Sequence, residues 1–209
     1  MKTAIGTAAI VLMCMMGAIP ARAQQHPMKM SKGPATLRST LEFQLTIQER
    51  EFEGAADAMP ADKYDFAPTN GDFKGVRTFA QEVKHVATAN DRFFGAILGH
   101  PPTTPADKFE QENGPDSIKT KAQIMQYLRE SFAEGHKAIA SITDENAFQP
   151  LGKAPVPFLS TRAALAIFAC VHMNDHYGQM VEYLRDNGIV PPASRNRPLA
   201  NPPTPPSGK

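Results

Sequence analysis

Two histidines, His172 and His176, lie four residues apart in a stretch that we predict to be helical. Because a helix turns by about 100° per residue, side chains at this spacing project one above the other from the same face. Two imidazoles placed in this way can bind one metal ion without straining the backbone. Gln179 continues the same face and could orient a water molecule or a substrate. The segment therefore predicts two metal ligands, with Gln179 as a candidate catalytic residue.

A third ligand comes from an earlier segment. His85 lies among apolar residues of another predicted helix, on the side expected to face the core. Helical bundles build metal sites from side chains on facing helices, so His85 can complete the set with His172 and His176. Three neutral imidazoles leave one coordination position open for water, and nitrogen ligands without thiolate favour zinc or nickel, with iron as a further option. We expect apolar walls around this site, made by Phe79, Phe93 and Phe168.

The same histidines also have a simpler interpretation. Pairs with this spacing arise by chance, and a single buried histidine such as His85 is often only a hydrogen-bonded core residue. The alternative is therefore a bundle whose histidines bind no metal. His136 lies at the edge of an apolar helix face and is a weaker candidate ligand. We expect His100, in a Gly-His-Pro-Pro turn, and His26, near the N-terminus, to be exposed to solvent.

Composition excludes several classes of protein. The 209 residues include 22 Lys and Arg against 21 Asp and Glu, so the formal net charge of +1 offers no electrostatic surface for nucleic acid. Two cysteines are too few for a disulfide framework, and no CxxC motif occurs. Glycine-rich nucleotide-binding loops are also absent from the sequence. With 42% hydrophobic and 21% charged residues, the chain has the composition of a globular protein.

The first 23 residues have the features of a secretory signal peptide. Lys2 precedes an almost wholly apolar run over residues 4–17, and Ala21-Arg22-Ala23 forms a small-x-small cleavage site. The alternative is an uncleaved membrane anchor. Cleavage after Ala23 would give a secreted or periplasmic protein without stable membrane insertion, because no later stretch is long and apolar enough to span a bilayer.

Four helices are predicted between a flexible lead-in at residues 24–35 and a disordered tail at residues 191–209, which holds seven prolines. Apolar residues recur at helical spacing over about 36–59, 78–98, 118–142 and 160–187. Thr78 and Gln81 form a capping box, and Gly99 is a natural stop for the second helix. No stretch of strand-like alternation appears in the sequence. We therefore predict an all-α fold, a four-helix bundle over residues 36–190.

The fourth predicted helix has a second apolar face, roughly opposite the histidines. It consists of Cys170, Met173, Tyr177, Met180 and Leu184. Because a bundle helix usually buries one face, two apolar faces need two partners. We expect a homodimer packed on this helix, which would suit a symmetric oligomer. The alternative is that flanking loops and the tail cover this face.

The chain also resembles the DinB family of metal-binding helical bundles. The resemblance is carried by residues 64–68, 77–90 and 117–132, and above all by residues 172–192, which read HMNDHYGQMVEYLRDNGIVPP. It covers about residues 36–194 and implies an up-down-down-up bundle. It also implies that nickel or zinc is held by one histidine of the second helix and two of the fourth, at His85, His172 and His176. Several family members use cytoplasmic thiol cofactors, which an exported protein would not meet.

Two functions follow from these expectations. The first is an exported, metal-dependent enzyme of hydrolase type, in which the metal activates water toward a small substrate of unknown identity. The second is a metal-binding or partner-binding bundle without catalysis. Turnover on a panel of substrates would separate the two.

Overall fold

The computed structural model describes residues 34–100 and 112–195. Within these ranges the chain forms four α-helices and no strand, apart from a single bridge between Pro150 and Thr161. None of these helices is both long and apolar enough to cross a membrane. The predicted signal peptide lies outside the described residues, as does most of the predicted lead-in. The helices are α1 (Leu37–Ala58), α2 (Phe79–Leu98), α3 (Lys121–Ala140) and α4 (Arg162–Asp186), and short 3-10 turns occur at η1 (Ala61–Lys63) and η3 (Pro192–Ser194).

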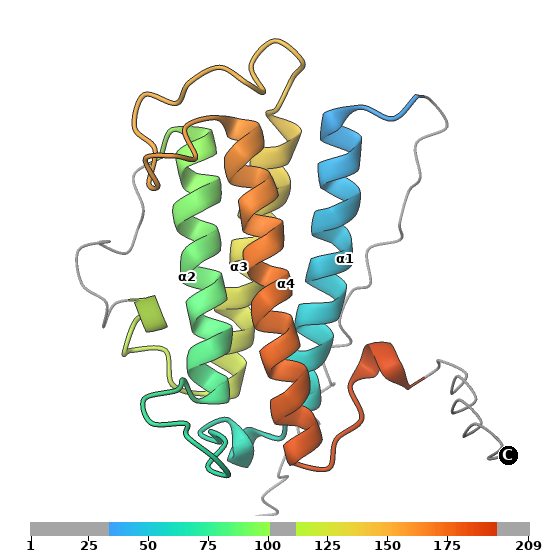
Figure 1. Ribbon diagram of the computed structural model, residues 1–209, viewed down its shortest axis with the longest axis vertical. Helices are drawn as coiled ribbons and strands as arrows, with labels where there is room; N and C mark the ends of the chain where they lie inside the picture. The colour runs from blue at the N-terminus through green and yellow to red at the C-terminus, as the bar shows by residue number, and fades with distance from the viewer. Residues whose placement is uncertain (1–33, 101–111, 196–209) are drawn as a thin grey trace, which may run out of the picture.

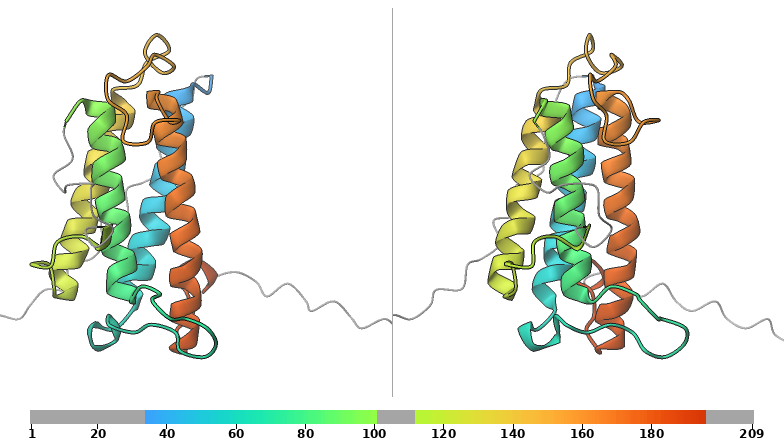
Figure 2. Two further views of the ribbon diagram at one scale, coloured as in Figure 1. Left: turned by 60° about the vertical axis from the view of Figure 1, so that its left-hand side comes forward. Right: turned by 90° about the vertical axis from the view of Figure 1, so that its left-hand side faces the viewer.

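The four helices pack side by side as a bundle, which confirms the predicted fold class (Figure 1). Both α1 and α2 pack against α3 and α4, so α1 and α2 lie on a diagonal of the bundle. Figures 1 and 2 show that α1 and α4 run in one direction and that α2 and α3 run in the other. This is the up-down-down-up order that the family resemblance implies.

Since α2 and α3 are parallel neighbours, the chain between them must return along the length of the bundle. A helix of 20 residues such as α2 is about 30 Å long, and the connection comprises residues 99–120. Its described end lies against α2, where Lys84 Nζ donates a hydrogen bond to the carbonyl oxygen of Pro115 over 3.2 Å. This return path brings Glu112 next to His85 on α2.

Threonine side chains determine where all four helices begin. Each accepts a hydrogen bond from the backbone N–H three residues later, which satisfies one of the free donors at the helix start. The predicted capping box of Thr78 and Gln81 is confirmed, as is the stop at Gly99, whose φ is 79°. The third helix starts later than predicted because Thr120 is its cap, and Gln123 accepts hydrogen bonds from the preceding amides.

The predicted apolar faces of the first three helices form the core. They include Leu45 and Phe52 of α1, Val83 and Phe94 of α2, and Leu128 and Phe132 of α3, all of which are buried. The tightest approach is at Gly135 of α3, where an added Cβ would lie 2.8 Å from the ring of Phe94 and 3.1 Å from Leu45. Gly135 therefore lets α3 pack closely on both α1 and α2.

The second apolar face of α4 is covered within the chain. Cys170, Met173, Met180 and Leu184 are buried and Tyr177 is half-buried. A helix in a square bundle has two neighbouring helices. Because α4 packs on both α1 and α2, the buried part of its surface is wider than a single helix face. The expectation that this face needs a second subunit to cover it was therefore wrong. The homodimer itself stays a prediction.

The ordered chain also continues beyond the predicted end of the bundle. Pro191 is buried, and η3 packs against α1, where Pro192 lies over Gly54. Residues 191–195 of the predicted disordered tail are thus part of the packed structure, because their proline rings cover apolar surface at the end of α1. Residues 196–209 of that tail lie outside the described residues.

Candidate metal centre

The structure brings His85, His172 and His176 together between α2 and α4. One ligand nitrogen from each ring lies within 4.8 Å of the others. His85 Nε2 and His172 Nε2 are 3.2 Å apart, and His176 contributes a ring whose centroid is 4.6 Å from that of His85. His85 and His176 are almost completely buried, whereas His172 is half-buried at the edge of a cavity. The predicted cluster of three imidazoles is therefore present.

Two of the rings are held in place through their outer nitrogens. His85 Nδ1 lies 2.8 Å from the backbone carbonyl oxygen of Glu112, and His176 Nδ1 lies 2.6 Å from Oε2 of Glu82. Both oxygens are acceptors, so each Nδ1 carries a proton, and in the neutral ring this leaves the lone pair on Nε2. Metal-bound histidines in proteins are oriented by hydrogen bonds of this kind. His172 Nδ1 is buried without a partner among the described residues.

The spacing and the protonation states of His85 and His172 suit a divalent ion. Zinc binds imidazole nitrogen at about 2.0–2.1 Å, so two nitrogens on a tetrahedral ion are about 3.3 Å apart. The 3.2 Å between His85 and His172 matches that spacing. Burial, with help from the nearby Arg77 and His176, lowers the pKa of His85 to about 4. Burial and the other two histidines lower the pKa of His172 to about 3, so both rings are neutral at pH 7, as ligands must be.

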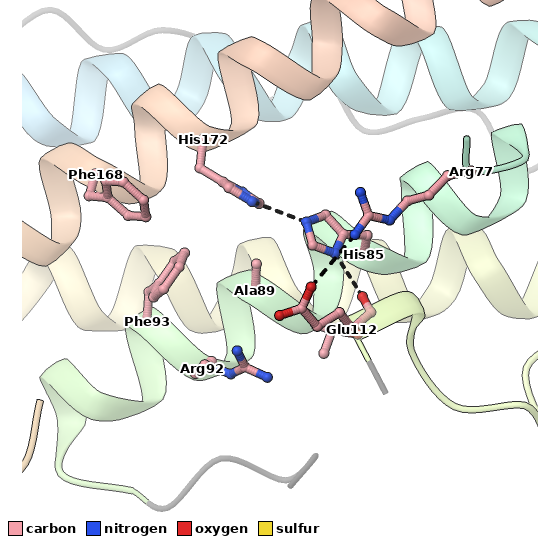
Figure 3. Close-up of a pocket in the computed structure, with 9 residues that line it drawn as sticks. Arg77, His85, Ala89, Arg92, Phe93, Glu112, Phe168 and His172 are labelled. Carbon is pink, nitrogen blue, oxygen red and sulfur yellow. Dashed lines mark hydrogen bonds and ion pairs between the residues drawn. The ribbon is translucent and has the colours of Figure 1, made fainter. Parts of the chain in front are cut away.

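A cavity of about 290 Å³ adjoins the histidines (Figure 3). Phe93 and Phe168 form its apolar wall, with ring centroids 5.4 Å apart, and Phe93 meets the ring of His172 edge-on at 5.8 Å. Phe79, predicted as a third wall, does not line the cavity and packs instead against Tyr64. The cavity is lined by Arg77, His85, Thr88, Ala89, Arg92, Phe93, Glu112, Phe168 and His172.

A family model describing the DinB superfamily matches residues 44–180, which is more than half of the chain. The chain belongs to the DinB superfamily. A conserved protein from Enterococcus faecalis has a similar solved structure, with 16% identity, a TM-score of 0.58, and coverage of 73% of this chain and 97% of its own. An uncharacterised protein from Escherichia coli UTI89 has 14% identity, a TM-score of 0.56, and coverage of 73% and 95%. Because both sequence identities are low, the two solved structures support the fold of this chain and say nothing of its function. No curated protein matches the chain.

Gln179 does not line the cavity of this DinB protein. Its side chain is half-buried, and its Nε2 donates a hydrogen bond to Oδ2 of Asp175 over 3.1 Å. In this rotamer the amide is engaged with its own helix, so a role in orienting water or substrate stays a prediction.

The other described histidines lie outside the cluster. His136 lies between α1 and α3, with Nδ1 2.7 Å from Oε1 of Glu42 and Nε2 3.1 Å from Oε2 of Glu49. His100 is exposed, as predicted. His26 lies outside the described residues.

Sequence reasoning missed the acidic and basic residues around the site. Glu82 lies three residues before His85, so helical spacing alone could have placed both on one face of α2. Arg92, seven residues after His85, lies on that face as well. Glu112 and Arg77, whose Nη2 lies 3.7 Å from the Glu112 carboxylate, come from connections without a helical period. No local pattern marked them.

Proposed function

We propose that this DinB protein binds one divalent metal ion through Nε2 of His85, His172 and His176, and that it acts as a metal-dependent enzyme of hydrolase type. The observation that supports this most is the outward anchoring of two rings by Glu112 and Glu82, which turns their Nε2 lone pairs inward. Zinc or nickel suits three neutral nitrogens, and iron is a further option.

The contacts of His172 support a cation at this position. His85 Nε2 is an acceptor, because the Nδ1 proton is donated to Glu112. Without a metal, His172 Nε2 must therefore donate to it, which leaves the buried Nδ1 of His172 as an acceptor with no partner among the described residues. A cation would accept the lone pairs of both Nε2 atoms, so that neither nitrogen has to donate to the other, while His172 Nδ1 would still have no partner among the described residues.

Each residue around the cluster has a separate part in the proposed reaction. When bound, the metal would polarise a substrate oxygen and lower the pKa of a water molecule. Phe93 and Phe168 keep bulk water from one wall of the cavity, which strengthens polar interactions inside it. The Glu112 carboxylate lines the cavity, so its position would let it take up a proton at Oε, and its pairing with Arg77 keeps it ionised until then.

Metal content per chain tests the site directly. We expect about one divalent ion per chain in the parent protein, purified without a polyhistidine tag and assayed by elemental analysis. His85→Ala, His172→Ala and His176→Ala should lose most of it. His26→Ala, His100→Ala and His136→Ala should keep it, because His100 and His136 do not join the cluster. Full stoichiometric metal in His172→Ala would place the ion elsewhere.

Catalysis needs a second experiment. The metal-loaded and metal-free proteins are assayed on a panel of small esters, amides and phosphate esters, with Glu112→Gln and Gln179→Ala alongside. Turnover that requires metal supports the enzyme. A protein that binds metal and turns over no substrate would be the non-catalytic binding bundle.

We also propose that the protein acts outside the cytoplasm. The support is the apolar run at residues 4–17 followed by Ala21-Arg22-Ala23. Cys170 would then be the single thiol of the mature chain, and burial raises its pKa to about 11, so it is unreactive.

A further inference from the structure

Arg92 carries a charge in the cavity that the described chain leaves without a partner. Its Nε and Nη2 atoms are buried, and neither has a hydrogen-bond partner among the described residues. Arginine stays protonated in proteins, so the half-buried Arg92 is a cation with two buried donors that have no partner in the part of the chain that the structure describes. Leaving such donors unsatisfied destabilises a fold, and a ligand acceptor would relieve that cost.

The two free nitrogens are the pair that recognises an oxyanion. Nε and Nη2 form one edge of the guanidinium group, and their N–H bonds point in the same direction. A carboxylate or a phosphate can accept both hydrogen bonds side by side, which is among the strongest polar contacts in proteins. This edge has no partner among the described residues and is shielded from solvent in this structure, so Arg92 offers a bidentate site to an oxyanion when its side chain turns toward the cavity that it lines.

Arg77, the other arginine of the cavity, is already engaged. Its Nε donates to Oδ1 of Asn113 over 2.7 Å, and its Nη2 lies 3.7 Å from Oε2 of Glu112. Among the described lining residues, Glu112 is the single carboxylate, and it is paired with Arg77. With the histidines neutral, this described part of the lining has a net positive charge, which Arg92 carries.

Arg92 lies on the same face of α2 as His85. Arg92 lies two helical turns after His85 on α2, a rise of about 10.5 Å, with the small Ala89 between them. In Figure 3 the Arg92 guanidinium lies below Ala89, with Phe93 to its upper left and Glu112 to its upper right. Because Arg92, Phe93 and Phe168 line the same cavity as His85 and His172, a small molecule anchored on Arg92 would extend toward the histidines, with its body against the two phenyl rings.

We propose that the substrate of this protein is a small organic anion, whose carboxylate or phosphate group binds side-on to Arg92 while its apolar part packs on Phe93 and Phe168. The inference rests on the proposed function, because it names the substrate class of the same cavity. Arg92 is in this view a substrate-binding residue that keeps the reacting group near the histidines.

Calorimetric titration of the mature protein tests this, with phenylacetate, phenyl phosphate and the neutral phenylacetamide as probes. We expect at least one anion to bind 10-fold or more tightly than the amide, and the two anions separate a carboxylate from a phosphate preference. Arg92→Gln should weaken the binding of that anion by about 10–100-fold, and Arg92→Lys should weaken it less, since the charge stays but the fork is lost. Arg185→Gln, at an exposed arginine of α4 paired with Glu182, should bind as the parent does.

Thermal unfolding and metal content of the same samples distinguish a loss of anion binding from a loss of folding or of metal. Arg92→Gln should melt no lower than the parent, because it removes two buried charged donors that have no partner among the described residues, and it should keep the parent's metal content. Equal binding of anion and amide, binding of neither anion, or unchanged anion affinity in Arg92→Gln would overturn the inference. A parent that selects the anion but holds no metal would instead contradict the proposed function alone.

Discussion

Nδ1 of His176 lies 2.6 Å from Oε2 of Glu82, and the two side chains are only 7% and 1% exposed. This contact joins α4 to α2, the two helices that carry the candidate metal ligands. Glu82 shares a face of α2 with His85, which lies three residues later. One face of α2 therefore supplies one imidazole of the cluster and orients another.

Glu82→Gln should weaken metal binding about 10–100-fold, because a neutral amide holds the Nδ1 proton of His176 less strongly and makes Nε2 a poorer ligand. Affinity is measured by competition with a chelating dye. Glu49→Gln is the matched control, since Glu49 contacts His136 in the same way on the far side of the bundle. Equal losses in the two variants would show that the effect is a general one on the fold.

His136 should stabilise the protein more in mildly acidic solution than in alkaline solution. Its hydrogen bond to Glu49, and then the charges of Glu42 and Glu49, raise its pKa despite the opposing effect of burial. A raised pKa means that the folded state holds the proton more tightly, so the stabilisation is complete below about pH 6.5 and is lost as pH rises through the raised pKa. His85 and His172, whose pKa values are lowered, act in the opposite sense.

The measurement is urea unfolding of the parent and of His136→Gln at pH 6 and pH 9. The difference between the two proteins isolates His136, since both contain His85 and His172. We expect a larger difference in the free energy of unfolding at pH 6. The same difference at both pH values would contradict the prediction.

Gly135→Ala should destabilise the bundle by about 1–2 kcal/mol. The added methyl group would lie 2.8 Å from the buried ring of Phe94, and overpacking of this kind costs more than the roughly 1 kcal/mol that alanine gains in helix propensity. Gly178→Ala on α4 is the control, because it is exposed and nothing lies within 4 Å of its added Cβ. That variant should be more stable than the parent by about 0.5–1 kcal/mol in the same unfolding assay.

Expression in an exporting bacterium should yield a mature chain that begins at Gln24. The sequence Ala21-Arg22-Ala23 provides the small residues that signal peptidase requires. Intact mass and N-terminal sequencing of the protein from the periplasm measure this. Full-length protein recovered from the membrane fraction would indicate an uncleaved anchor instead.

Much of the site was accessible from local spacing. His172 and His176 project from one face because they are four apart on a helix, and His85 faces the core for the same kind of reason. Glu82 could have been found by the same rule. Glu112 could not, since it reaches His85 from a connection 27 residues later in the chain. Its carbonyl oxygen reaches His85 because α2 and α3 are parallel, so that the connection between them has to pass along α2.

The sequence by itself determined the four helices, the capping box of Thr78 and Gln81, and the three histidines, because apolar period, capping and helical spacing are local properties of a chain. Only the tertiary structure decided which surfaces are covered. The wide buried stripe of α4 and the packing of η3 on α1 follow from which helices become neighbours. The same packing buries Nε and Nη2 of Arg92 beside the histidines without a partner among the described residues. Whether a side chain is buried or paired depends on residues that are distant in the sequence, so no local pattern can predict it.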